Sequence, residues 1–147
     1  MPSLSISSPV GRLILDEADG ALVAIRWADE KTGNGSPLLN EAARQLEDYF
    51  AGRRTDFDLP LRPTGSDFER RVWDGMRRIP YGSTKSYGEL AASIGSGPRA
   101  VGGACGKNPI PIVIPCHRVL AKAGMGGYSG SGGLKTKQAL LAIEGAL

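Results

Sequence analysis

The first 61 residues contain three short runs in which polar and apolar positions alternate or apolar residues cluster, and such runs predict strands. The runs cover residues 3–7, 11–16 and 20–27. The dipeptide Asp19-Gly20 between the last two is typical of a hairpin turn. Apolar residues then recur at the spacing of an amphipathic helix: Leu38, Leu39, Ala42, Ala43, Leu46, Tyr49 and Phe50. We therefore expect residues 1–61 to form a small β-rich N-terminal domain that serves as structural support.

The pattern changes after Pro60 and Pro63, where short helices joined by tight turns are predicted. Capping-box pairs open two of these helices: Ser66 with Glu69, and Ser86 with Glu89. A further apolar pattern predicts a last helix over residues 134–144. The chain is therefore expected to have an α/β (α+β) fold, with residues 62–147 as a helical C-terminal domain.

A helix-turn-helix is the candidate DNA-binding element of this second domain. The helix after Ser86 is followed by a glycine turn at residues 95–97 and by a short helix beginning at Pro98. Any pair of packed helices gives the same pattern, and such pairs are commoner than DNA-binding helix-turn-helix motifs. The second helix has little side-chain bulk, and Arg99 alone at its start is long and charged. A helix of this kind can approach another surface closely but lacks the polar side chains that read base edges.

Length and composition narrow the class of protein. A chain of 147 residues with 41% hydrophobic and 22% charged residues suits an ordinary globular protein. Neither a membrane span nor a signal segment is evident, so a cytoplasmic location is expected. Cys105, Cys116 and His117 are the only cysteines and the only histidine, which is too few for a four-ligand zinc site or a disulfide scaffold. We therefore expect no metal.

Charge is divided unequally along the chain. Residues 1–61 hold six Lys/Arg and ten Asp/Glu, for a net charge of −4. Residues 62–147 hold twelve Lys/Arg and five Asp/Glu, for a net charge of +7. A basic half of this kind suggests contact with a polyanion, although a solvated basic surface explains the same numbers.

Residues 108–119 are the most informative stretch for chemistry. The prolines at positions 109, 111 and 115 predict a stiff, extended path that ends at Cys116 and His117. An imidazole that accepts the thiol proton raises the reactive thiolate fraction, and a carboxylate that fixes its tautomer helps. Glu144, the only acid after Leu90, is the leading candidate for that carboxylate. The alternative is a plain buried cysteine, because neighbours in an extended segment point opposite ways. Cys105 is interpreted as packing.

Several motifs of this chain resemble those of one protein family. The stretch at residues 115–119 resembles the active-site signature of the O6-alkylguanine-DNA alkyltransferases, also called methylated-DNA–protein-cysteine methyltransferases. Further segments resemble the same family in the same order: residues 79–82, 86–91, 99–104, 108–109, 127–130 and 140–145. The resemblance covers about residues 66–145, and the first 61 residues match more loosely, in size and in the order of strands and helix.

The resemblance implies a DNA-repair transferase that acts once. Cys116 would take the alkyl group from O6-alkylguanine, with O4-alkylthymine as a second candidate lesion, and would keep it irreversibly. His117 would activate Cys116 through a water, Glu144 would orient His117, and Asn108 would hold the turn before Cys116. Further roles implied by the family fall to residues around the lesion: Tyr87 to rotate the flipped nucleotide's phosphate and protonate the leaving guanine, Arg99 to replace the lost base in the stack, Ala100, Gly102 and Gly103 to enter the minor groove, and Val119, Tyr128 and Ser129 to line the pocket.

The expected partner is double-stranded DNA that carries the lesion, bound by a monomer through the minor groove with little sequence preference; no cofactor and no membrane are expected. Two segments depart from the family. The turn at residues 95–97 is a residue or two shorter, and the loop at residues 129–133 is a residue or two longer. Some members carry zinc in the N-terminal region, and this chain lacks the ligands.

Two other function classes compete with a repair enzyme. A non-catalytic protein that flags the lesion would carry tryptophan at the nucleophile position, and Cys116 argues against it. A Cys-His hydrolase would need an oxyanion hole and an attacking water, and no hydrolase motif accompanies the pair.

Overall fold

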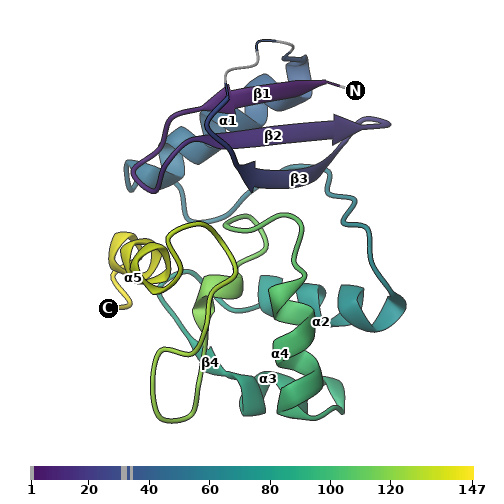
Figure 1. The fold of residues 1–147 in the computed structure, drawn as a ribbon, viewed down its shortest axis with the longest axis vertical. Coiled ribbons are helices and arrows are strands. Elements are labelled where there is room, and N and C mark those ends of the chain that lie inside the picture. Colours follow the sequence, from purple (N-terminus) through teal and green to yellow (C-terminus); the bar gives the residue numbers. More distant parts are fainter. Residues whose placement is uncertain (1, 31–32, 34) are drawn as a thin grey trace.

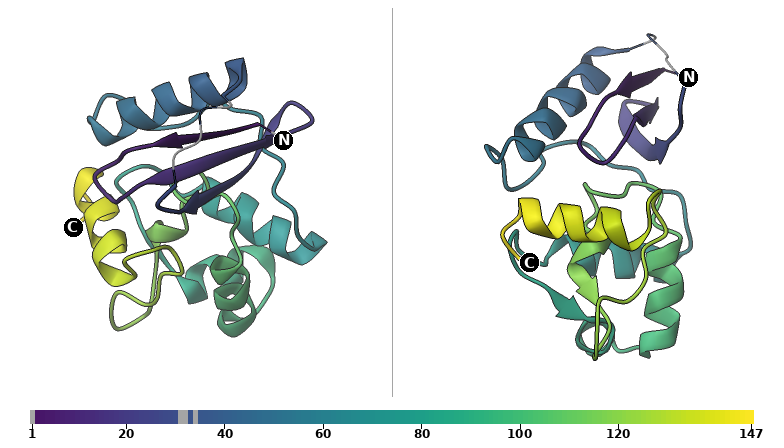
Figure 2. Two further views of the ribbon diagram at one scale, coloured as in Figure 1. Left: turned by 45° about the horizontal axis from the view of Figure 1, so that its top comes forward. Right: turned by 60° about the vertical axis from the view of Figure 1, so that its left-hand side comes forward.

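The computed structural model describes residues 2–30, 33 and 35–147. Its N-terminal part is a three-stranded antiparallel sheet in the order β1 (Ser3–Ile6), β2 (Leu13–Ala18) and β3 (Ala21–Trp27). Asp19 and Gly20 both have positive φ, at 50° and 77°, as the predicted hairpin turn between β2 and β3 requires. Figures 1 and 2 show the sheet standing over the C-terminal helices.

Helix α1 (Pro37–Phe50) lies along one face of this sheet (Figure 2). Ser36 caps it by accepting a hydrogen bond from the Leu39 amide at 3.1 Å. The buried positions of α1 are Leu39, Ala42, Gln45, Leu46 and Tyr49. They recur every three or four residues, so one stripe of the helix faces the core. The predicted strands and helix are confirmed.

The C-terminal part contains the predicted helices α2 (Asp67–Arg77), α3 (Tyr87–Ile94), α4 (Pro98–Gly106) and α5 (Leu134–Ile143). Both capping boxes are present, at Ser66 with Glu69 and at Ser86 with Glu89. Between α3 and α4, Gly95 takes φ 71°, a left-handed conformation that ends the first helix. The pair α3–α4 forms the predicted helix-turn-helix. The predicted α/β (α+β) class is confirmed, with an N-terminal three-stranded sheet and a helical C-terminal domain.

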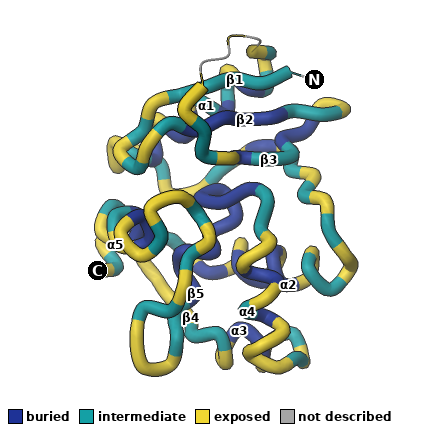
Figure 3. The backbone as a smooth tube through the Cα atoms, in the orientation of Figure 1, coloured by how far each residue is buried: buried dark blue, intermediate teal, exposed yellow. Residues whose placement is uncertain are grey.

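The segment that holds the candidate nucleophile runs through the middle of the molecule. Residues 110–119 are all buried (Figure 3). The short strand β5 (Val119–Leu120) pairs in parallel with β4 (Lys85–Ser86), which fixes the segment to the start of α3. One continuous hydrophobic cluster extends from Leu13 in β2 to Leu140 in α5, so both parts of the chain share a core.

The path of this segment differs from the prediction, because it is folded rather than extended. Ile114 donates a backbone hydrogen bond to Ile110 at 2.9 Å, and Ile112 has φ 76°. Cys116–Arg118 then forms one turn of 3₁₀ helix. The prolines restrict only their own φ and the residue before them, so Ile112 is left free to reverse the chain. Positive φ is costly for a β-branched residue, and this one is held by its burial and by the turn around it.

Among the described residues, no helix is both long enough and apolar enough to span a bilayer. Among the same residues, no group of three or more His, Cys, Asp and Glu side chains is placed to hold a metal ion.

Candidate active site

A cavity of about 290 Å³ lies between the helix-turn-helix and the loop that precedes α5. Its wall contains Tyr87, Gly102, Cys105, Gly106, Cys116, Gly127, Tyr128 and Ser129. The fold thus brings together five residues that the sequence assigned to catalysis, to the pocket or to DNA: Tyr87, Gly102, Cys116, Tyr128 and Ser129. The volume suits a small flat ligand rather than a chain segment.

Asn108 reaches across the reversed turn before Cys116. Its Nδ2 donates to the Ile114 carbonyl at 2.8 Å, and its Oδ1 accepts from the Ile110 amide at 3.0 Å. These two bonds clamp the ends of the strained turn around Ile112. The Asn108 side chain also acts on the Cys116 thiol, because it lowers the pKa of that thiol. Asn108 thus spans the turn that precedes Cys116.

The thiol of Cys116 is buried, with 6% of the residue exposed. Burial raises its pKa above the usual range, whereas the Asn108 hydrogen bond and the positive charge of Lys137 lower it. Burial has the larger effect, so the thiol is protonated at neutral pH in the absence of DNA. An acceptor for its proton is then a requirement of any nucleophilic role.

His117 and Glu144 form a buried pair. His117 Nε2 lies 2.6 Å from Glu144 Oε2, and both side chains are fully buried. Burial raises the pKa of Glu144, but the hydrogen bonds from His117 and Arg118 outweigh it and bring the pKa to about 2. Burial lowers the pKa of His117 more than Glu144 raises it, so the ring is neutral.

The tautomer of His117 follows from these charge states. An ionised carboxylate can only accept, so Nε2 must carry the proton and donate it to Glu144. The other nitrogen, Nδ1, is then an acceptor. Within the described part of the chain this buried atom has no hydrogen-bond partner. The pair therefore presents a free base beside the residue that carries the thiol.

Two further residues surround Glu144. Arg118 makes a bidentate ion pair with it, Nε to Oε1 at 2.8 Å and Nη2 to Oε2 at 3.0 Å. Tyr49, from α1, donates its hydroxyl to Oε2 at 2.6 Å. Neither residue was identified from the sequence. Arg118 stands next to His117 in the predicted signature, but Tyr49 looks like any core aromatic at helical spacing.

Lys137 is also missing from the sequence prediction. It is fully buried, and its Nζ donates to the carbonyls of Val119 at 2.7 Å and Gly127 at 2.9 Å. It thereby ties the strand after Cys116 to the cavity loop. Its spacing of three and four residues from Leu140 and Leu141 places a lysine on the apolar face of α5. That unusual position is the signal that could have found it.

The two cavity tyrosines remain protonated. Burial, and after it the nearby Cys105 and Cys116 thiols, raise the pKa of Tyr87. Burial raises the pKa of Tyr128 as well, and its buried hydroxyl has no hydrogen-bond partner among the described residues. Each can therefore donate a hydrogen bond to a ligand in the cavity.

Two predicted positions differ in detail. Val119 is buried and pairs with β4, and it does not line the cavity. Cys105 packs against Met76, with Sγ 3.4 Å from Sδ, but it also forms part of the cavity wall. The sequence could not separate these two cases. A buried residue that lines a pocket and a buried residue that lies behind its wall have the same local sequence pattern.

The outer face of α4 is bare. Arg99 and Ala100 are exposed, and a Cβ added at Gly102 or Gly103 would meet nothing within 4 Å. One side of α4 lines the cavity through Gly102 and Gly106. A surface pressed against this helix therefore lies directly beside the cavity mouth.

Comparison with known proteins gives matches along nearly the whole chain. Residues 67–146 match the DNA binding domain of 6-O-methylguanine DNA methyltransferase, and residues 4–63 match its ribonuclease-like domain. The methylated-DNA–protein-cysteine methyltransferase of Mycolicibacterium paratuberculosis is 46% identical over 95% of this chain and 90% of its own length. The constitutive enzyme of Bacillus subtilis is 40% identical over 93% and 91%.

Solved structures agree with these matches. The Mycobacterium tuberculosis O6-methylguanine methyltransferase is 41% identical, with a TM-score of 0.88 over 99% of this chain and 93% of that one. The M. tuberculosis protein in complex with DNA is 42% identical, with the same TM-score over 99% and 94%.

Proposed function

The chain belongs to the O6-methylguanine DNA methyltransferase family, and from this premise we propose how its own residues carry out the reaction. It is a methylated-DNA–protein-cysteine methyltransferase that binds DNA and repairs O6-methylguanine. Membership decides against the hydrolase that the Cys-His pair alone left open. The observation that carries the residue-level proposal is Cys116 in the cavity wall, next in sequence to a neutral His117 held by Glu144.

The reaction begins with proton removal. The Cys116 thiol gives its proton through a bridging water to His117 Nδ1, the buried nitrogen without a partner in the described chain. The imidazolium that results is stabilised by the ionised Glu144. The thiolate sulfur then attacks the methyl carbon on guanine O6, so an S–C bond forms and the C–O bond breaks.

The leaving guanine departs as an anion and needs a proton. Tyr87 lines the cavity and stays protonated at neutral pH, so its hydroxyl supplies that proton. Afterwards the His117 imidazolium releases the thiol proton to solvent, and solvent returns a proton to Tyr87. The products are S-methyl Cys116 and unmodified guanine. Because a thioether has no carbonyl and no good leaving group, neither water nor His117 removes the methyl group, and each chain acts once.

DNA approaches the bare face of α4 through its minor groove. The small residues Ala100, Gly102 and Gly103 allow close contact, and they carry no groups for base readout, so little sequence preference is expected. The net charge of +7 on residues 62–147 supplies sequence-independent attraction to phosphate. A monomer leaves the outer face of α4 open to DNA. A reducing cytoplasm keeps Cys116 a free thiol.

The experiment that tests this function is stoichiometric. Incubation with excess duplex DNA holding one O6-methylguanine is expected to add one methyl group per chain, on the peptide that contains Cys116. Intact and peptide mass spectrometry measure the product, and chromatography of the DNA counts repaired guanine. Repair of several equivalents by a chain with unmodified Cys116 would contradict the single-turnover mechanism.

Arg99→Ala is expected to slow repair of duplex DNA by about ten-fold or more while it leaves reaction with free O6-methylguanine base unchanged. Arg99 is exposed at the start of α4, where it can fill the stack that the flipped base leaves. Flipping costs a few kcal/mol, and a free base needs none. Single-turnover rates on both substrates make the comparison. Equal losses on the two would place Arg99 in the chemistry or the fold instead.

A further inference from the structure

The N-terminal domain contains one side chain that reaches the reactive centre. Tyr49 lies near the end of α1 and is fully buried. Its ring packs among Phe50, Phe57 and Tyr81, with centroid distances of 5.3, 5.4 and 6.2 Å. Its hydroxyl points out of this aromatic cluster and donates a hydrogen bond to Glu144 Oε2 at 2.6 Å.

The oxygen that Tyr49 contacts is the same one that orients the histidine. His117 Nε2 and the Tyr49 hydroxyl each lie 2.6 Å from Oε2. Arg118 contacts both carboxylate oxygens, and the Gly82 amide reaches Oε1 at 3.4 Å. Among these donors, Tyr49 is the one from the N-terminal domain.

We propose that Tyr49 is a positioning residue for alkyl transfer, whose hydroxyl fixes the Glu144 oxygen that holds His117 and thereby makes docking of the N-terminal domain a condition of full activity. The proposal rests on the function proposed above for Cys116, His117 and Glu144. It assigns a role in the reaction to a domain that the sequence indicated only as support.

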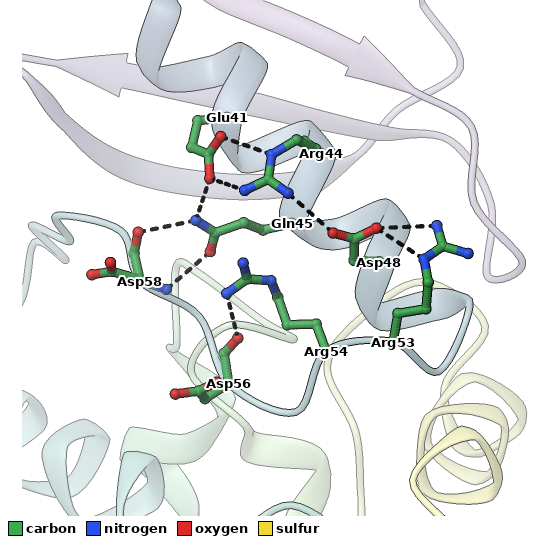
Figure 4. A network of polar contacts seen from close by, with 8 residues as sticks. All are labelled: Glu41, Arg44, Gln45, Asp48, Arg53, Arg54, Asp56 and Asp58. Carbon is green, nitrogen blue, oxygen red and sulfur yellow. Dashed lines mark hydrogen bonds and ion pairs between the residues drawn. The ribbon is translucent and has the colours of Figure 1, made fainter.

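Contacts between α1 and the chain segment that follows it set the position of Tyr49. Polar contacts tie the helix to that segment (Figure 4). Gln45, one turn before Tyr49, donates to the Asp58 carbonyl at 3.1 Å and accepts from the Asp58 amide at 2.9 Å. The Tyr49 ring contacts Phe57 of that same segment. These contacts therefore hold the Tyr49 hydroxyl in place against Glu144.

The sign of the effect on His117 follows from competition at Oε2. A donor to an ionised carboxylate stabilises the anion and weakens its pull on other protons. Loss of the hydroxyl therefore makes Glu144 a stronger acceptor for His117 and raises the pKa of the ring, which burial holds low. The other charges that act on His117, Arg118 and Lys137, both lower its pKa and are unchanged by the substitution.

Tyr49→Phe tests the proposal, with Tyr81→Phe as the matched control. Tyr81 loses a hydroxyl in the same aromatic group, but its partner is the Ile143 carbonyl at 3.1 Å, not Glu144. His117 is the only histidine in the chain, so its ring signals in ¹H–¹⁵N NMR are assigned without ambiguity. The second measurement is the rate of methyl transfer from duplex DNA between pH 5 and 9.

We expect Tyr49→Phe to move the His117 titration up by about half a unit or more. Methyl transfer at pH 7 is expected to slow by about ten-fold. The acid limb of the pH–rate profile is expected to move to higher pH, as the His117 titration does. Tyr81→Phe is expected to leave both pH profiles in place, even where it lowers the melting temperature. Site-specific 3-fluorotyrosine at position 49 strengthens the donor without removing any atom contact, and we expect it to move the His117 titration down.

Several outcomes would overturn the proposal. These are an unchanged His117 titration in Tyr49→Phe, an equal change in Tyr81→Phe, a shift of the same sign with fluorotyrosine, or a shifted titration with an unchanged rate profile. If the parent chain gains no methyl group on Cys116, the proposed function fails instead, and the NMR titration still shows whether Tyr49 acts on His117.

Discussion

Cys116→Ser is expected to abolish methyl transfer, with a loss on the order of a thousand-fold or more. The hydroxyl is close to the thiol in size, so the cavity and the Asn108 contacts are kept. A hydroxyl ionises far less readily than a thiol, and burial lowers the pKa of His117 and so makes it a weaker base for the hydroxyl proton. Binding to duplex DNA with O6-methylguanine is expected to persist, since α4 is untouched.

Transfer of radiolabelled methyl from the DNA to the protein measures the first result, and a mobility-shift titration measures the second. The variant still holds Cys105 in the same cavity wall. Burial raises the pKa of that thiol to about 12, and the hydrogen bond found for it within the described residues goes to Met76 Sδ. Label on Cys105 in the variant, or loss of transfer in a folded Cys105→Ser protein, would show that the nucleophile is assigned wrongly.

Glu144→Gln is expected to lower the free energy of unfolding by about 3–5 kcal/mol and to slow transfer severely. The substitution leaves the buried guanidinium of Arg118 without its counter-charge, and an uncompensated buried charge is costly. The amide also no longer fixes the His117 tautomer, because it both donates and accepts. Denaturant unfolding at pH 7 measures the stability change, and the slope of the transition checks that both proteins unfold in one step.

The pH dependence of stability gives a second readout of the same residue. The pKa of Glu144 is lowered to about 2 from an ordinary value of 4.5. A depressed pKa means that the stabilisation is complete above pH 4.5 and is lost as the pH falls toward 2. The parent protein is expected to lose stability steeply in that window, and Glu144→Gln to lose less. Parallel curves would place the stabilising charge elsewhere.

Much of the fold was determined by short-range patterns in the sequence. The hairpin at Asp19-Gly20, the two capping boxes and the glycine at the end of α3 were all predicted, because each depends on residues within a few positions of one another. The family resemblance likewise rests on contiguous motifs. The extended path through residues 108–119 was predicted wrongly, because the left-handed turn at Ile112 is imposed by packing and by the Asn108 clamp rather than by local preference.

The sequence by itself thus determined the strands, the helices, the helix-turn-helix and the candidate catalytic pair, Cys116 and His117. The tertiary structure decided which distant groups act on that pair. Glu144 lies 27 positions from His117, and Tyr49 lies 95 positions from Glu144, yet His117 Nε2 and the Tyr49 hydroxyl each lie 2.6 Å from Glu144 Oε2. No local pattern sets such a distance, because side chains far apart in the chain meet only when a shared core brings their helices together. For the same reason the sequence could have shown that Lys137 lies on an apolar helix face, but it could not have shown its two carbonyl partners.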